Sequence, residues 1–178
     1  MKTLGHRSLA TFLRVALRIV LILLYVAIPL TVLGCAVALM KSYGVDINWF
    51  DMPRPPSPLI TWLFTALFAV SLAGTIIIVD QLRRIFATLS DGDPFVPENA
   101  LHLRVIWMTL AVWELVRYAL AGTMMATMIA LRIEPPEGFE NDPFNFSLGI
   151  WFAVLTVIVL AEVFREGARM RQEQKLTI

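Results

Sequence analysis

The sequence predicts an all-α membrane protein with four transmembrane helices. The 178-residue chain is 58% hydrophobic and 16% charged, whereas soluble domains carry about 25% charged residues, and its mean hydropathy is +0.72. Its apolar residues gather in four long runs, and about 20 apolar residues suffice to cross the roughly 30 Å hydrocarbon core as a helix. We therefore expect a single membrane domain over residues 1–178, with helices over about 19–40, 59–89, 97–131 and 146–170.

The first two runs are free of charge. Ile19–Met40 follows a basic leader without acids, and Pro29 is expected to kink this helix. Leu59–Val79 follows the proline-rich residues 53–58, which indicate a stiff outer connector, with a proline-rich ligand for a partner as the alternative. Val32–Cys35 resembles a lipoprotein cleavage box, but the apolar run continues beyond it, so an uncleaved span is the preferred interpretation.

The most polar stretch, Asp80–Arg104, lies between the second and third spans. The second helix is expected to continue to about residue 89, where Gly92 can supply a left-handed cap and Pro94 prevents the helix from resuming. Pro97 suits the first turn of the next helix. This pattern predicts a helix-turn-helix-like connector. An apolar stripe before it should face the inner headgroups or another helix: Leu82, Ile85, Phe86 and Leu89.

The third run, Val105–Leu131, carries charges deep inside a span. Glu114 and Arg117 lie about 15 and 20 Å along the helix from Arg104. An isolated charge at such depth costs at least about 2.5–3.5 kcal/mol, and residues three apart can pair on one helix face. Two interpretations follow, a proton or solute relay and a structural ion pair. The structural pair is favoured because the other spans hold no second charge at this depth.

Small residues at four-residue spacing predict the faces on which helices pack, because they allow close approach in lipid. The second run carries Ala69 and Ala73, and the third carries Gly122, Ala126 and Ala130.

The distribution of Lys and Arg predicts the orientation. Basic residues cluster in the leader, the connector and the tail, whereas Lys41, Arg54 and Arg132 stand at the opposite ends of the spans. By the positive-inside rule, both termini and the connector are cytoplasmic. We therefore expect a multi-pass membrane protein with both termini in the cytoplasm.

Charged and turn-forming residues gather at the expected cytoplasmic surface, at the ends of three helices. They indicate a candidate interface for a cytosolic protein, with ordinary interfacial charges as the alternative. Basic residues there also attract anionic lipid, at about 1 kcal/mol each. The candidate interface comprises Asp80, Arg83, Arg84, Gly92, Pro94, Phe95, Asn99, Arg104, Glu162, Arg165, Glu166 and Gly167.

Patterns for catalysis, cofactors and metals are missing from the sequence. It has no Gly-rich phosphate loop, no His-Glu-x-x-His and no nucleophile elbow, and its one cysteine and two histidines do not build a structural zinc site. The acidic stretch 132–145 indicates a solvated face, with a divalent-cation site as the alternative. We expect no catalytic, cofactor-binding or metal-binding residue, no enzyme activity and no direct nucleic-acid binding.

Two segments together carry a recognisable pattern. Leu89–Asn99 followed by Leu103–Ile106 has the form Gly-x-Pro-Phe…Asn…Leu-Arg-x-Ile, and Leu160–Ala168 precedes a Leu-Thr-Ile ending. The pair resembles a bacterial integral membrane family catalogued as domain of unknown function 2975. His102 stands where that pattern has Arg, which weakens the case for an acid or phosphate contact there. The resemblance implies four membrane helices and, for some members, genes beside small helix-turn-helix regulators; it supplies no activity, substrate or cofactor.

Two functions from different classes follow. The first is a non-enzymatic sensing or partner-binding module whose cytoplasmic surface binds a protein such as a helix-turn-helix regulator. The alternative is a small transporter or channel subunit that uses Glu114 and Arg117. Four helices are few for a transport pathway, so this alternative requires a homo-oligomer. A membrane enzyme ranks third.

Overall fold

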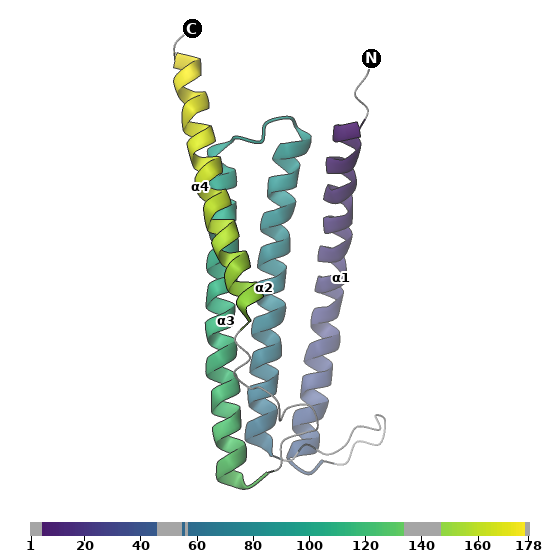
Figure 1. Cartoon of the computed structure of the whole chain (residues 1–178). Helices are drawn as coiled ribbons and strands as arrows, with labels where there is room; N and C mark the ends of the chain where they lie inside the picture. The colour runs from purple at the N-terminus through teal and green to yellow at the C-terminus, as the bar shows by residue number, and fades with distance from the viewer. Residues whose placement is uncertain (1–4, 46–54, 56, 134–146, 177–178) are drawn as a thin grey trace. The chain divides into compact units, whose positions relative to one another are not determined.

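The computed structural model describes residues 5–45, 55, 57–133 and 147–176, and all regular structure within them is helical (Figure 1). Each helix contains a stretch long and apolar enough to cross a membrane. The predicted all-α fold with four membrane-spanning helices is therefore confirmed. The helices are α1 (Gly5–Ser42), α2 (Pro58–Ser90), α3 (Pro97–Leu131) and α4 (Leu148–Leu176).

Two helices are longer than the sequence predicted. α1 begins at Gly5 rather than Ile19, because the leader lacks proline and is rich in Ala, Leu and Arg, which favour helix. It continues through Pro29. α4 extends to Leu176 rather than ending near residue 170. α2 and α3 begin and end within a residue of the prediction.

The described ends of α1, α2 and α3 share one kind of cap. After α2, the Gly92 amide donates to the Leu89 carbonyl at 3.2 Å and the Asp93 amide donates to the Thr88 carbonyl at 3.1 Å. These are the paired hydrogen bonds of a Schellman motif, which needs a left-handed residue. The predicted cap at Gly92 is thus confirmed. The left-handed residues are Gly44 (φ 91°), Gly92 (φ 85°) and Arg132 (φ 53°).

The helices contribute to two compact units. Unit 1 comprises Met1–Leu24, Gly74–Val112 and Leu148–Ile178, and unit 2 comprises Tyr25–Ala73 and Trp113–Ser147. The single membrane domain expected over residues 1–178 stays a prediction.

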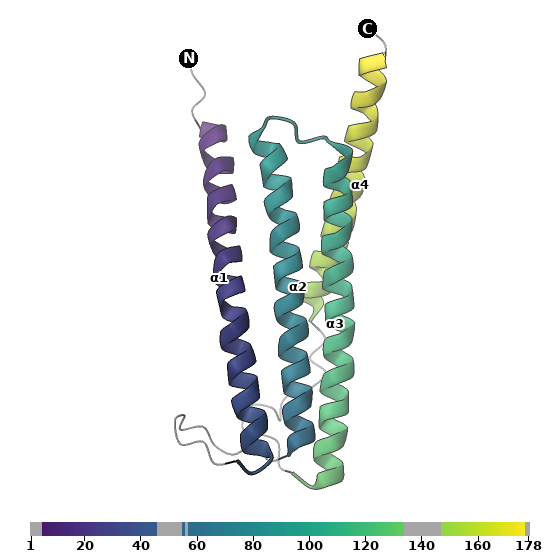
Figure 2. The same ribbon diagram turned by 180° about the vertical axis from the view of Figure 1, so that it is seen from behind.

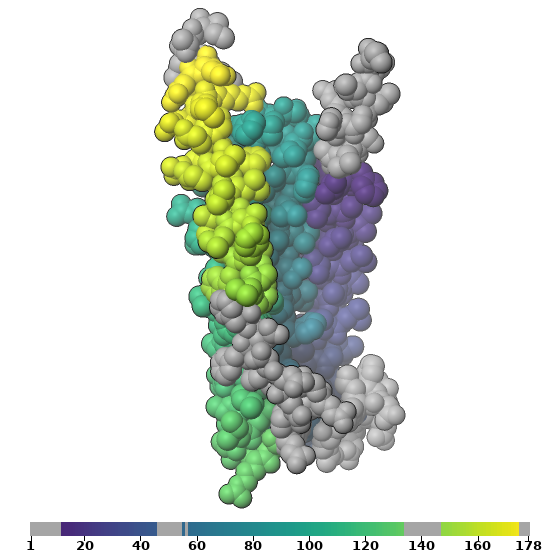
Figure 3. All heavy atoms as spheres, viewed as in Figure 1, coloured from purple at the N-terminus to yellow at the C-terminus, as the bar shows by residue number. Residues whose placement is uncertain are grey.

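The core of unit 1 joins α2, α3 and α4. Ile85 on α2 is buried with Leu103 and Ile106 on α3, and α4 adds apolar side chains that include Phe164. Three residues of the predicted apolar stripe of α2, Leu82, Ile85 and Leu89, belong to this core and so pack on other helices. Figures 1 and 2 show α4 beside the first turns of α3 from both sides, and Figure 3 shows α4 as an exposed ridge.

Unit 2 has a smaller core between α2 and α3. Ile60 on α2 is buried against Met124 and Met128 on α3. Trp113 Nε1 on α3 donates a hydrogen bond of 3.0 Å to Ser71 Oγ on α2. A polar bond between two apolar helices adds specificity to contacts that dispersion alone would hold.

Four of the five small residues predicted to form packing faces do not pack within this chain, and the fifth, Gly122, is half-buried. Ala69 and Ala73 on α2, like Ala126 and Ala130 on α3, are exposed. The buried face of α3 instead follows Ala121, Met124 and Met128. The flexible thioether side chains fill the space between the helices, so close approach of small residues is not what brings these helices together.

Candidate functional site

The two segments that stand out in the sequence meet in unit 1. The Phe95 ring of the connector covers Gly167 of α4 so closely that a Cβ at position 167 would lie 2.6 Å from Phe95 Cδ1. Any larger residue at 167 would therefore displace the ring. One turn earlier on α4, Phe164 packs on Phe95 with ring centroids 5.6 Å apart and a 42° tilt, a favourable aromatic arrangement. The connector is thus docked on α4.

A charged contact extends this docking. Arg171 of α4 donates to the Asp93 carboxylate of the connector. Phe164, Gly167 and Arg171 follow i, i+3, i+7 spacing, so they lie on one face of α4. We call residues 91–96 together with this face the docked connector.

Asn99 shapes the connector from inside. Its side chain is fully buried, and Nδ2 donates to Thr88 Oγ1 at 2.7 Å and to the Pro94 carbonyl at 2.8 Å. Asn99 Oδ1 is buried without a hydrogen-bond partner among the described residues. Asn99 therefore ties the last turn of α2 to the loop and acts on the shape of the connector, because it has no exposed surface to offer a partner.

Most candidate interface charges pair within their own helix. Asp80 binds Arg83 at 2.8 Å and Arg84 at 2.9 Å, and Glu162 binds Arg165 at 3.0 Å. Glu166 similarly binds Arg169 at 2.7 Å. The Glu162 and Glu166 pairs are exposed, and exposed pairs contribute about 0–1 kcal/mol, whereas Asp80 is half-buried. Their effect is to reduce the net charge that the surface presents.

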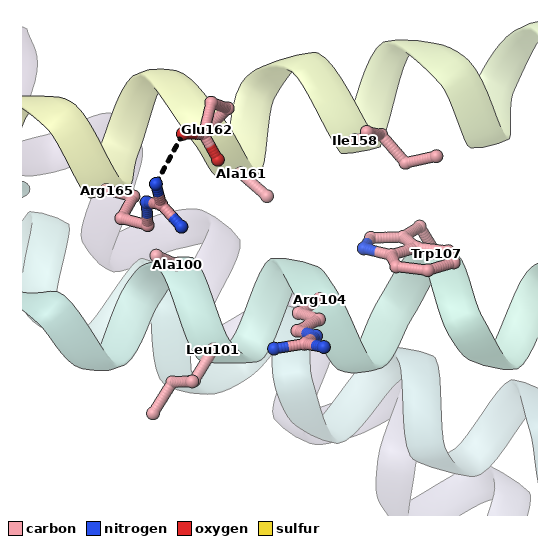
Figure 4. Close-up of a pocket in the computed structure, with 8 residues that line it drawn as sticks. All are labelled: Ala100, Leu101, Arg104, Trp107, Ile158, Ala161, Glu162 and Arg165. Carbon is pink, nitrogen blue, oxygen red and sulfur yellow. Dashed lines mark ion pairs between the residues drawn. The ribbon is translucent and has the colours of Figure 1, made fainter.

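A groove of about 320 Å³ lies between α3 and α4 in unit 1 (Figure 4). Three candidate interface residues line it: Arg104, Glu162 and Arg165. Arg104 is exposed and has no ion-pair partner among the described residues. Sequence patterns identify these charges but not the groove, because Trp107 and Ile158 resemble ordinary span residues.

The predicted pair in the third span is present in unit 2. Arg117 donates to both carboxylate oxygens of Glu114, from Nε at 2.9 Å and from Nη2 at 2.7 Å. Glu114 is 0% exposed and the Arg117 side chain is 24% exposed. The guanidinium also lies 4.7 Å from the Tyr118 ring centroid. A bidentate, buried pair satisfies both charges; a relay role for it stays a prediction.

Contacts between positions distant in the sequence were missed. His102 Nδ1 lies 2.6 Å from Gln81 Oε1 and so links α3 to α2. The Asp93–Arg171 pair and the partnership of Thr88 with Asn99 were also not foreseen. The sequence predicts contacts only between residues spaced three or four apart in one helix, and these contacts join residues of different helices or of a helix and a loop.

Two predictions fall mostly outside the described residues, namely the stiff character of 53–58 and the cation alternative for 132–145. Within the described part, no group of three or more His, Cys, Asp or Glu side chains could hold a metal ion. Cys35 is a free thiol inside α1.

A match to a protein family covers the docked connector. Residues 47–178 match a family described as "Protein of unknown function (DUF2975)". Comparison with curated proteins and with solved structures gives no match.

We predict that Gly167→Ala destabilises the protein only when Phe95 is present. In the natural background the added methyl meets the ring, and overpacking of this kind costs about 1–3 kcal/mol. In a Phe95→Ala background the same change removes a helical glycine and should stabilise by about 0.5–1 kcal/mol. SDS-induced unfolding of the purified protein measures both. Equal costs in the two backgrounds would contradict the docking.

We also predict that Glu114→Gln lowers the amount of folded protein in the membrane. It deprives the Arg117 guanidinium of its carboxylate, and breaking a buried pair costs about 3–5 kcal/mol. The Glu114→Leu/Arg117→Leu double variant should recover much of the lost amount of folded protein. Glu162→Gln, which breaks an exposed pair, should not lower that amount. Normal abundance of Glu114→Gln together with lost proton or solute flux would instead support the relay.

Proposed function

The chain belongs to the family of proteins of unknown function DUF2975, and from that premise we propose a non-enzymatic module of the bacterial inner membrane that binds a cytoplasmic protein. The binding surface is the docked connector with the neighbouring ends of α3 and α4. The proposal rests on the packing of the Phe95 ring on Gly167, which joins two segments distant in the sequence into one surface.

Preorganisation supports a binding role. The connector is held at its ends by the Gly92 cap and by Pro97, from inside by Asn99, and on α4 by Phe95 and Asp93. Binding to a surface that is already ordered avoids the entropy cost of ordering it. The Asp93 carboxylate, the Pro94 carbonyl and the Asn99 amide are engaged in these structural contacts, which supports positioning rather than catalysis.

The composition of the exposed surface also supports a binding role. Phe95 is 41% exposed, Leu101 61% and Met170 52%, and charged side chains surround them. Aromatic residues, Met and Arg are enriched in protein interfaces. Apolar anchors within a rim of charges suit a protein partner, and a small helix-turn-helix regulator is the partner class that we propose.

The orientation supports a cytoplasmic partner. The docked connector, the basic leader and the basic tail all belong to the segments that the positive-inside rule assigns to the cytoplasm. We accordingly propose that both termini are cytoplasmic.

The transporter alternative would place function at Glu114. The closed bidentate pair with Arg117 supports a structural role, because both oxygens of the carboxylate are already bound. A partner-binding module is therefore the function that we propose.

We predict that a photo-crosslinking amino acid at Met170 captures a soluble cytoplasmic protein in intact cells. Met170 is exposed beside the docked connector. Leu155 is the matched control, because it is 60% exposed on the same helix but lies within the uncharged run. Mass spectrometry of the adducts identifies the partner.

Gly167→Val should reduce the Met170 adduct, because it displaces Phe95 and disturbs the surface. The same adducts at Met170 and Leu155, or a Met170 adduct that Gly167→Val leaves unchanged, would contradict the proposal.

A further inference from the structure

The groove between α3 and α4 in unit 1 combines arginine side chains with an apolar floor. Its volume is about 320 Å³, at the lower end of ligand pockets, which range over roughly 300–1,000 Å³. Figure 4 shows Trp107 between the two helices and the Arg165 guanidinium extended from α4 toward α3. The lining residues are Ala100, Leu101, Arg104, Trp107, Ile158, Ala161, Glu162 and Arg165.

Helical spacing gives the groove a polar end and an apolar end. On α3, Arg104 precedes Trp107 by three residues, about 4.5 Å along the axis. On α4, which runs past it in the opposite direction, Arg165 follows Ile158 by seven residues, about 10 Å. The charged residues therefore lie toward one end of the groove, with Arg165 farthest from Trp107 and Ile158 and Arg104 between them (Figure 4).

The polar end coincides with the level at which both helices change from charged to uncharged sequence. On α3, no charged residue follows Arg104 until Glu114, and on α4 none precedes Glu162 back to Leu148. In a spanning helix this change marks the membrane surface, where lipid phosphates lie and Trp is enriched. The groove thus opens at headgroup level and continues into the hydrocarbon.

The charge of the polar end is positive. Glu162 is neutralised by its 3.0 Å pair with Arg165, and Arg104 has no ion-pair partner among the described residues. A soluble anion would satisfy the arginines but leave the Trp107 and Ile158 surface uncovered. An anion that carries an acyl chain satisfies both ends.

We propose that this groove binds an anionic phospholipid of the surrounding bilayer. The phosphate lies between Arg104 and Arg165, and the upper part of an acyl chain runs along Trp107 and Ile158. Basic pockets between membrane helices are a known way to hold anionic headgroups. The groove adjoins the proposed partner surface and shares Leu101 with it, and its existence does not depend on which side of the membrane the groove faces.

The test uses the full-length protein in nanodiscs and the fluorescence of Trp107. Bromine on a lipid acyl chain quenches a tryptophan that it contacts, and comparison with a Trp107→Phe variant isolates the signal of this residue. Dibrominated phosphatidylglycerol and dibrominated phosphatidylcholine are titrated at equal fractions into unbrominated phosphatidylcholine. Half-maximal quenching of Trp107 should require less brominated phosphatidylglycerol than brominated phosphatidylcholine.

Variants separate the groove from general surface attraction. Arg104→Gln should raise the fraction of brominated phosphatidylglycerol needed for half-maximal quenching by about fivefold, the effect of about one surface arginine. Arg104→Lys should retain most of the preference because it keeps the charge. Arg18→Gln removes an exposed arginine from α1, outside the groove, and should change nothing at Trp107. Monodisperse elution in each case confirms that the variant is folded.

Equal quenching by the two lipids, or an equal loss for Arg104→Gln and Arg18→Gln, would overturn the proposal. Relief of quenching by excess glycerol phosphate or inorganic phosphate would also overturn it, because the site would then recognise a free phosphate. The proposal is supported if Trp107 prefers phosphatidylglycerol, if Arg104→Gln loses this preference and Arg104→Lys keeps it, and if free phosphate does not change it.

Discussion

The contact between the Phe95 ring and the backbone at Gly167 is the constraint on which the docked connector depends. A turn between two helices has no reason by itself to lie on a third helix. It does so here because glycine leaves the ring a place on α4 that any Cβ would occupy. Phe164 then packs on the ring and Arg171 binds Asp93. Removal of the helix-disfavouring glycine would improve α4 alone and harm the unit, so the local cost is offset by a tertiary contact.

Most of the described ion pairs form between residues three or four apart in the same helix. Asp80, Glu114, Glu162 and Glu166 each bind an arginine three residues later. The same spacing has different consequences in different places. At exposed positions the pairs contribute little and mainly lower the net charge. At Glu114, which has no exposed surface, the pair makes a charged residue tolerable in an apolar span. Arg104 departs from this pattern, and it lines the groove.

The sequence predicted what depends on local rules. Long apolar runs located four helices, Gly92 and Pro97 marked the turn, and i, i+3 spacing paired Glu114 with Arg117. It did not predict which faces pack. Small residues indicated Ala126 and Ala130, whereas Met124 and Met128 are buried, because volume in the interface decides the face. Likewise Gly167 and Phe95 were both singled out, but nothing in either segment says that they touch, since the contact depends on how α4 crosses the connector.

A disulfide between positions 95 and 167 tests the docked connector most directly. A Cβ at 167 would lie 3.4 Å from Phe95 Cγ, which brings the two Cβ atoms close to disulfide range, typically about 3.5–4.5 Å. In a Cys35→Ser background, Phe95→Cys/Gly167→Cys should cross-link intramolecularly on mild oxidation in native membranes. Phe95→Cys/Glu173→Cys, with the second cysteine about 9 Å further along α4, should not. Failure of the first pair to cross-link, or equal cross-linking of both pairs, would contradict the account.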